Sequence, residues 1–251
     1  MFSLGVRKMF RWILVIFICT SILLPNGAEA QEDETDFQTW TDFTTFMFVS
    51  NRSAVGGDVG IRGLASSKGW TQLYIRPTYR LQYNSLDLAG GVGLFYTYNK
   101  EFSNITELRL FQQATLHWPT THLLKFSHRG RFEQRFFHYS DPGEGESEDE
   151  YFNRFRYQIM IRTRDINIFN QKFYFKTAAE FFQKNNSGKE AFVNRNRLTL
   201  AIGHRFKGKW WYEIHYISQR SRQFEEDGLK TSEHILRLRL FRAAIFRHRI
   251  E

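Results

Sequence analysis

Apolar and polar residues alternate along most of this chain. In residues 70–83, for example, Leu73 and Ile75 alternate with Gln72 and Arg76. Successive side chains of a β-strand point to opposite faces of the sheet, so such a run is apolar on one face and polar on the other. The pattern therefore predicts two-faced strands.

Eleven runs of this kind are separated by short stretches rich in Asn, Gly, Ser or Pro, which favour turns. Most runs are longer than strands in soluble sheets, and their length suits tilted strands that cross a bilayer. Bacterial single-chain outer-membrane barrels close with an even number of strands, so we expect one N-terminal run to be assigned wrongly. We predict an all-β fold, a single antiparallel transmembrane β-barrel of ten or twelve strands. The runs span residues 38–49, 54–64, 70–83, 86–98, 104–117, 122–137, 151–165, 171–184, 191–206, 210–222 and 232–241.

The start of the chain has the features of a secretory signal. Three basic residues precede an apolar run from Trp12 to Leu24, and Ala28-Glu29-Ala30 follows. This apolar run is shorter than the roughly 20 residues that a membrane-spanning helix needs. We expect residues 1–30 to be a cleaved signal peptide, with cleavage after Ala30, and residues 31–251 to form the barrel domain.

Alternation alone does not say which face is inside, because a soluble lipocalin-like barrel shows the same pattern with its apolar face inward. Such a barrel needs only about eight strands, and a cation at the bilayer midplane costs about 2–4 kcal/mol. We therefore expect an Arg-rich lumen and an apolar face against lipid, with a soluble barrel or sandwich as the alternative. Only four carboxylates, Glu107, Glu133, Glu180 and Glu213, share the polar phase, which predicts eleven uncompensated positive charges. The fifteen cations of that phase are Arg76, Arg80, Arg109, Arg129, Arg131, Arg135, Arg154, Arg156, Arg162, Lys176, Arg195, Arg197, Arg205, Arg237 and Arg239.

The basic lumen allows two interpretations. It can act as a narrow anion-preferring pore or an anion-binding barrel, because rings of Arg and Lys lower the energy of an anion. It can instead be a structural barrel whose polar core is plugged by ion pairs. The candidate lumen and anion-binding residues are Arg109, Arg129, Arg131, Glu133, Arg135, Arg154, Arg156, Arg195, Arg197, Arg237 and Arg239.

A third hypothesis is an outer-membrane lipid-modifying enzyme. The chain has no G-x-S-x-G, H-E-x-x-H or glycine-rich phosphate loop. Glu213 and His215 stand two residues apart on one strand face, and they form a weak candidate acid/base pair. No catalytic residue is assigned more firmly than these two.

Charge and cysteine content limit the classes of partner and ligand that we expect. The formal net charge is +9, but the cations follow strand phase and carry no recognition motif, so we expect no nucleic-acid partner. The single cysteine, Cys19, lies in the signal region, which leaves no cysteine metal ligand. The acidic loop 141–150 could bind divalent cations or be a solvated outer loop, and its spacing is not that of an EF-hand. We expect no cofactor and no metal; the oligomeric state stays open.

Short motifs across the mature chain resemble one known family. They are Phe37-Gln38-Thr39-Trp40, Arg76-Pro77, Glu107-Leu108-Arg109, the segment from His128 to Phe136, Arg154-Phe155-Arg156-Tyr157, Glu180-Phe181-Phe182, Asn194-Arg195-Asn196-Arg197 and His234-Ile235-Leu236-Arg237-Leu238. Together they resemble the outer-membrane β-barrel family catalogued as domain of unknown function 2490. The resemblance implies a bacterial outer-membrane location, with outer-membrane lipid as a partner, and assigns no activity. The chain departs from such barrels in its basic tail, residues 242–251, which lacks a terminal aromatic residue.

Overall fold

A computed structural model gives the fold of the chain. It describes residues 36–64, 69–99, 103–119, 123–140, 147–169, 171–185, 192–206, 209–221 and 230–245. The predicted signal peptide and its cleavage site lie outside these residues. None of the described segments is a helix of the length and hydropathy needed to cross a membrane. The strands are β1 (Asp36–Phe48), β2 (Ser53–Leu64), β3 (Trp70–Tyr83), β4 (Leu86–Asn99), β5 (Asn104–His117), β6 (Leu124–Ser140), β7 (Ser147–Thr163), β8 (Ile166–Ile168), β9 (Gln171–Asn185), β10 (Phe192–Arg205), β11 (Trp210–Ser221) and β12 (Lys230–Ile245).

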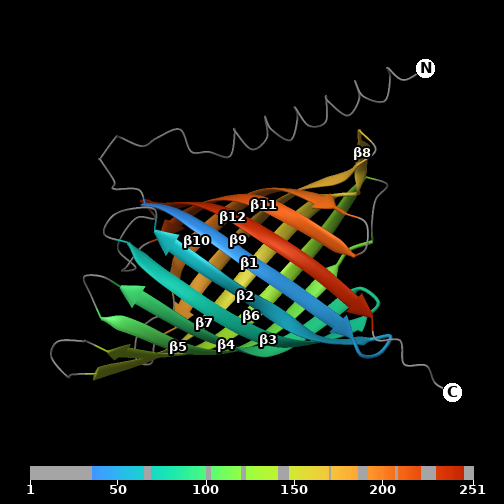
Figure 1. Cartoon of the computed structure of the whole chain (residues 1–251). Coiled ribbons are helices and arrows are strands. Elements are labelled where there is room, and N and C mark those ends of the chain that lie inside the picture. The colour runs from blue at the N-terminus through green and yellow to red at the C-terminus, as the bar shows by residue number, and fades with distance from the viewer. Residues whose placement is uncertain are drawn as a thin grey trace, which may run out of the picture. The chain divides into compact units, whose positions relative to one another are not determined.

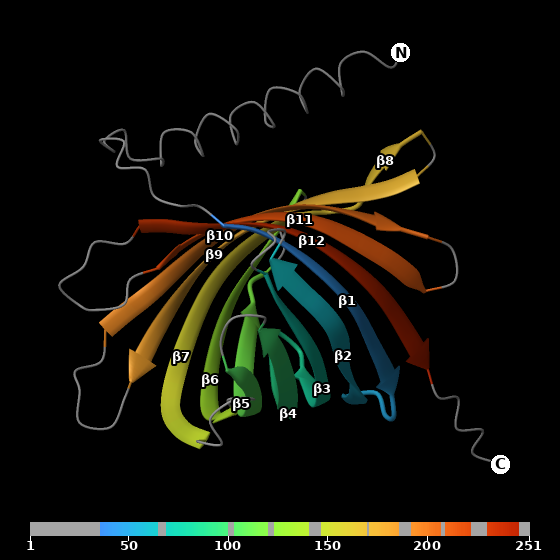
Figure 2. The same cartoon turned by 60° about the vertical axis from the view of Figure 1, so that its left-hand side comes forward.

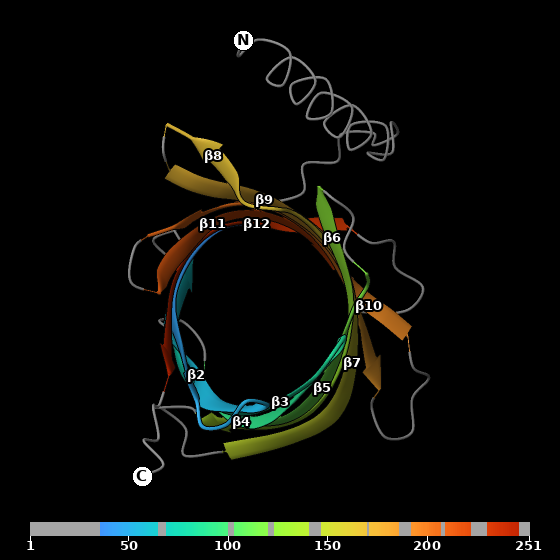
Figure 3. The same ribbon diagram turned by 90° about the vertical axis from the view of Figure 1, so that its right-hand side faces the viewer.

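Eleven of these strands form a closed, tilted ring, and β8 lies outside it (Figures 1, 2 and 3). Neighbours in the ring are antiparallel from β1 to β7, then β7 pairs with β9, and the order continues through β10 and β11 to β12. The three-residue β8 pairs only with β9 and forms a small hairpin at the rim. The predicted all-β barrel is confirmed.

The ring closes through a parallel pair. Asp36 in β1 lies opposite Glu233 in β12, and Phe48 lies opposite Ile245. An odd number of alternating strands leaves the last strand pointing the same way as the first, so the closing pair has to be parallel. The barrel is therefore mixed at this seam and not antiparallel throughout. All eleven runs found in the sequence are strands, including those near the N-terminus, and only the short β8 brings the total to twelve.

Charged side chains point into the ring and apolar side chains point away from it. Glu133 is 0% exposed and Arg109 is 5% exposed, whereas Leu73 and Leu94 on the outer face are 54% and 50% exposed. This is the reverse of a water-soluble protein, in which charged residues are seldom fully buried. The predicted Arg-rich lumen is confirmed.

Glycines on the inner face make room for aromatic rings. A Cβ added to Gly203 in β10 would lie 2.2 Å from the ring of Tyr174, and one added to Gly93 in β4 would lie 2.6 Å from the ring of Phe95. Phe95 in turn stacks on Tyr74, with 5.2 Å between ring centroids. The rings occupy lumen space and provide flat faces for the neighbouring arginines.

The two ends of the ring are defined here by β1. The first end, where β1 begins, carries the connections 65–69, 100–103, 141–146, 186–191 and 222–229. The second end, where β1 stops, carries the connections 49–52, 84–85, 118–123 and 206–209 together with the β8 hairpin.

Two boundaries differ from the sequence expectation. Part of the predicted acidic loop 141–150 is strand, because β7 begins at Ser147 and Asp149 accepts a hydrogen bond of 2.8 Å from His138 in β6. Residues 141–146 lie outside the described part. The basic tail contributes its first four residues to β12, which continues to Ile245.

Candidate functional site

A cavity of about 750 Å³ lies inside the ring. Trp70, Tyr139 and Asn194 line it near the first end, and Arg80 and His117 line it near the second end. The cavity therefore extends along the lumen between the two ends. Its walls hold all ten arginines of the candidate lumen and anion-binding set.

Positive charge predominates around this cavity. Nine carboxylates line it or pair with a residue that does, against fifteen lining cations, which leaves a surplus of six among the described residues. The carboxylates are Asp42, Asp58, Asp87, Glu107, Glu133, Glu150, Glu180, Glu213 and Glu233. The cations are Arg62, Arg76, Arg80, Arg109, Arg129, Arg131, Arg135, Arg154, Arg156, Lys176, Lys184, Arg195, Arg197, Arg237 and Arg239.

The expected surplus of eleven is thus too large. Arg162 and Arg205, which were counted as lumen cations, pair instead with Asp165 at the second end, where the Arg205 side chain is 48% exposed. Arg62 and Lys184 take their places in the cavity wall. Five of the nine carboxylates did not appear in the sequence count.

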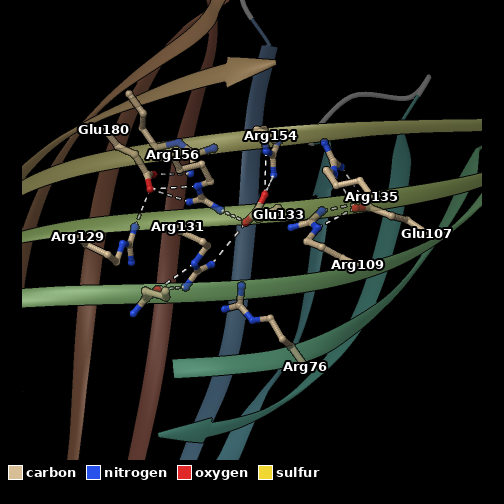
Figure 4. A network of polar contacts seen from close by, with 12 residues as sticks. Arg76, Glu107, Arg109, Arg129, Arg131, Glu133, Arg135, Arg154, Arg156 and Glu180 are labelled. Atoms are coloured by element: carbon tan, nitrogen blue, oxygen red, sulfur yellow. Dashed lines mark hydrogen bonds and ion pairs between the residues drawn. The ribbon is translucent and has the colours of Figure 1, made fainter. Parts of the chain in front are cut away.

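Glu133 is the centre of the largest ion-pair network (Figure 4). Arg154 and Arg156 on β7 donate to its carboxylate at 2.5 and 2.8 Å, and Arg131 lies 3.6 Å away. Arg156 also donates to Glu180 on β9 at 2.8 Å. One guanidinium therefore links two buried carboxylates and ties three strands together across the inner wall.

Two guanidinium forks hold Glu107 beside this network. The Nε and Nη2 groups of Arg109 donate to it at 2.7 and 2.8 Å, and those of Arg135 donate at 2.6 and 2.8 Å. Such bidentate, charge-assisted pairs fix both geometry and orientation. The forks keep these side chains against the wall and leave the cavity between them.

Two of the five carboxylates that the sequence interpretation missed are buried aspartates with arginine partners. Asp42 in β1 accepts hydrogen bonds from Arg237 at 2.6 Å and Arg239 at 2.8 Å, and Asp58 in β2 accepts a fork from Arg76 at 2.9 and 2.7 Å. Asp42 is 3% and Asp58 is 6% exposed. Their strands carry few other charges on the inner face, so no charged alternation pointed to them.

One known family model matches most of the chain. The family model described as a protein of unknown function (DUF2490) matches residues 37–230. The chain belongs to this family. No curated protein and no solved structure matches it. In this DUF2490 protein the match covers nearly all of β1 and the strands through β11, so it includes the Glu133, Glu107 and Asp58 pairs.

Three lining cations of the DUF2490 barrel have no ion pair with a described carboxylate. Arg62 lies 4.4 Å from the centroid of the Trp40 ring, and Arg80 lies 3.8 Å from that of Phe46. Arg195 has a buried Nε without a hydrogen-bond partner. Arg62 and Arg195 are near the first end and Arg80 is near the second. Positive charge without a paired carboxylate is therefore present near both ends of the lumen.

Glu213 and His215, the candidate acid/base pair, hydrogen-bond to each other. Nε2 of His215 donates to Glu213 at 2.7 Å, so this nitrogen carries the proton. Glu213 also accepts hydrogen bonds from Lys176 at 2.5 Å and Tyr174 at 2.7 Å. The three donors hold this carboxylate in a structural arrangement, and no hydroxyl nucleophile hydrogen-bonds to His215 in the described segments.

Within the described ranges, no group of three His, Cys, Asp or Glu side chains could hold a metal ion. Cation binding by the acidic loop stays a prediction, because residues 141–146 lie outside those ranges.

Proposed function

We propose that this DUF2490 protein is a bacterial outer-membrane barrel whose basic lumen conducts small anions. The outer face supports the membrane part of the proposal. Leu73, Ile75, Leu94 and other outward side chains form an exposed apolar surface, which in water would be unfavourable and against acyl chains is favourable. The signal-like start of the sequence agrees with export.

The excess of cations along the cavity is the observation that carries the anion part. A low-dielectric wall lined by one sign of charge concentrates ions of the opposite sign. Arg80 near one end and Arg62 and Arg195 near the other place unpaired cations where an ion would enter or leave. A chloride ion would therefore meet favourable potential along the passage, whereas a potassium ion would meet a barrier.

The ion-pair networks bear on the alternative of a plugged structural core. The forks on Glu107 and Glu133 join neighbouring strands and lie along the wall. They stabilise the ring and still leave the cavity of about 750 Å³. In this proposal the same arginines have both roles, because each guanidinium has more donors than one carboxylate oxygen can use.

The test is the reversal potential of the purified protein in planar bilayers under a potassium chloride gradient. The wild-type protein is expected to prefer chloride. Arg80→Gln should shift the permeability ratio toward unity, because it removes an end charge without leaving a carboxylate unpaired. Arg164→Gln is the matched control, since Arg164 is exposed in a connection. Equal permeability of both ions, or no conductance in the wild type, would contradict the proposal.

A further inference from the structure

Three arginines meet inside the lumen without a shared carboxylate. Arg76 comes from β3, and Arg129 and Arg131 come from β6 (Figure 4). Arg131 is repelled by both of the others, and Arg129 is also repelled by Arg76. Such a cluster of like charges is unfavourable by itself, so it needs either fixed partners or a bound anion.

The ring of Phe111 in β5 forms the floor of this cluster. The guanidinium carbons of Arg76 and Arg131 lie 5.6 and 4.9 Å from its centroid. Phe111 is itself 3% exposed, so its position is fixed by packing. Two cations on one ring are held near each other, and their planar faces have a common support.

Arg76 donates Nε and Nη2 to Asp58 at 2.9 and 2.7 Å, whereas the fixed partners of the other two arginines use only some of their donors. Arg131 donates Nε and Nη2 to the neutral Gln113, at 2.9 and 2.5 Å, and its nearest carboxylate, on Glu133, is 3.6 Å away. Arg129 donates Nη2 to Glu180 at 2.6 Å, but its Nε is buried and has no partner in the described structure. Donors therefore remain on arginines that already face one another.

We infer that Arg76, Arg129 and Arg131 form a binding site for a phosphate group within the lumen, an inference that rests on the proposed basic anion pathway. A phosphate oxyanion accepts several hydrogen bonds from guanidinium forks and carries up to two negative charges, so it suits several converging arginines. Chloride offers only one charge and no such geometry. The cavity of about 750 Å³ can hold inorganic phosphate or the phosphate of a small organic molecule.

The chain offers variants that remove the site and keep the ion-pair networks. Arg131→Gln leaves Glu133 with Arg154 and Arg156, which donate at 2.5 and 2.8 Å. Arg129→Gln leaves Glu180 with Arg156. No buried carboxylate loses its last cation in either variant.

A matched control removes one lumen charge elsewhere. Arg239→Gln leaves Asp42 with the 2.6 Å contact from Arg237. The control thus has the same change in net charge as the two site variants. A difference in binding between them therefore reflects the position of the lost arginine and not the loss of charge.

Binding is measured by isothermal titration calorimetry on the full mature chain in detergent. The ligands are inorganic phosphate, glycerol 3-phosphate as a headgroup-like monoester, and chloride. Saturable binding of phosphate is expected, with Kd weakened at least tenfold by Arg131→Gln and by Arg129→Gln and less than threefold by Arg239→Gln. Tighter binding of glycerol 3-phosphate would identify an organic phosphate as the occupant, and tighter binding of inorganic phosphate would identify the free ion.

Other results would overturn the site. These are no saturable phosphate binding by folded wild-type protein, an equal loss in all three variants, or equal affinity for chloride. The bilayer experiment separates this outcome from the proposed function. Chloride preference without phosphate binding removes the site and keeps the pathway, whereas phosphate binding without conductance supports the site and contradicts the pathway.

Discussion

Arg154 donates two hydrogen bonds, at 2.8 and 2.5 Å, to one oxygen of Glu133, whose side chain has no exposed surface. Taking both charges out of water is costly, and the pair is favourable only because geometry and further hydrogen bonds compensate. Arg156 and Arg131 contact the same carboxylate. Glu133 therefore neutralises a cluster of cations that would repel one another without it.

Glu133→Gln is expected to destabilise the barrel by about 3–5 kcal/mol, because it leaves buried arginines without their counter-charge. Urea unfolding from lipid vesicles, followed by tryptophan fluorescence, measures the change. Glu148→Gln makes the same chemical change at an exposed position and should alter stability little. Equal effects of the two substitutions would show that Glu133 has no special role in the wall.

Gly203→Ala should destabilise the barrel by about 1–3 kcal/mol through overpacking. The added methyl group would lie 2.2 Å from the Tyr174 ring and would displace the hydroxyl that donates to Glu213. Gly130→Ala is the control, since its nearest atom would be 3.8 Å away. The same unfolding assay applies, and an unchanged midpoint for Gly203→Ala would contradict the inward position of Tyr174.

Leu94→Arg should impair folding into lipid vesicles, because a cation on the proposed lipid face costs about 2–4 kcal/mol at the midplane. Tyr98→Arg lies on the same face of β4 but four residues nearer its end, where the cost falls to about 0–1 kcal/mol. Both parent side chains are 50% exposed. The folded fraction on unheated gels is the measurement. If both variants folded like the wild type, the apolar face would not meet lipid.

In the proposed membrane barrel, the parallel seam places the two termini of the barrel on opposite sides of the bilayer. Asp36→Cys and Arg242→Cys should react with a membrane-impermeant maleimide from different sides. Asn185→Cys at the first end and Ser85→Cys at the second end are reference sites. The natural Cys19 lies in the predicted signal peptide. Labelling of Asp36→Cys together with Ser85→Cys, from one side, would contradict the ring closure.

Strand positions and their orientation could be predicted from sequence because charge marks one phase clearly. In β6, Arg129, Arg131, Glu133 and Arg135 alternate with uncharged residues, and all four point inward. The ion-pair partners of these residues were only partly predictable. Register decides which strands are neighbours, and contacts such as Arg156 with Glu180 depend on it.

Other features of the structure leave too weak a pattern in the sequence to be predicted from it. Asp42 follows Gln38 and Trp40 on the inner phase of β1, so a neutral face concealed it. Arg62 likewise lies among the glycines of β2, so no alternation of charge marks it. The strand β8 has three residues and cannot show alternation. The parallel seam depends on contact between the first and last strands, which no local pattern records.

The seam between β1 and β12 also limits how this ring can be rebuilt. Asp36 in β1 lies opposite Glu233 of β12, twelve residues before Ile245, so a path of about 40 Å at ~3.3 Å per residue separates Asp36 from Ile245. A short linker cannot connect them, so circular permutation through a tight turn is ruled out. For the same reason, two copies of this gene fused in tandem could not extend the sheet through a hairpin, whereas barrels with an even strand count can grow in that way.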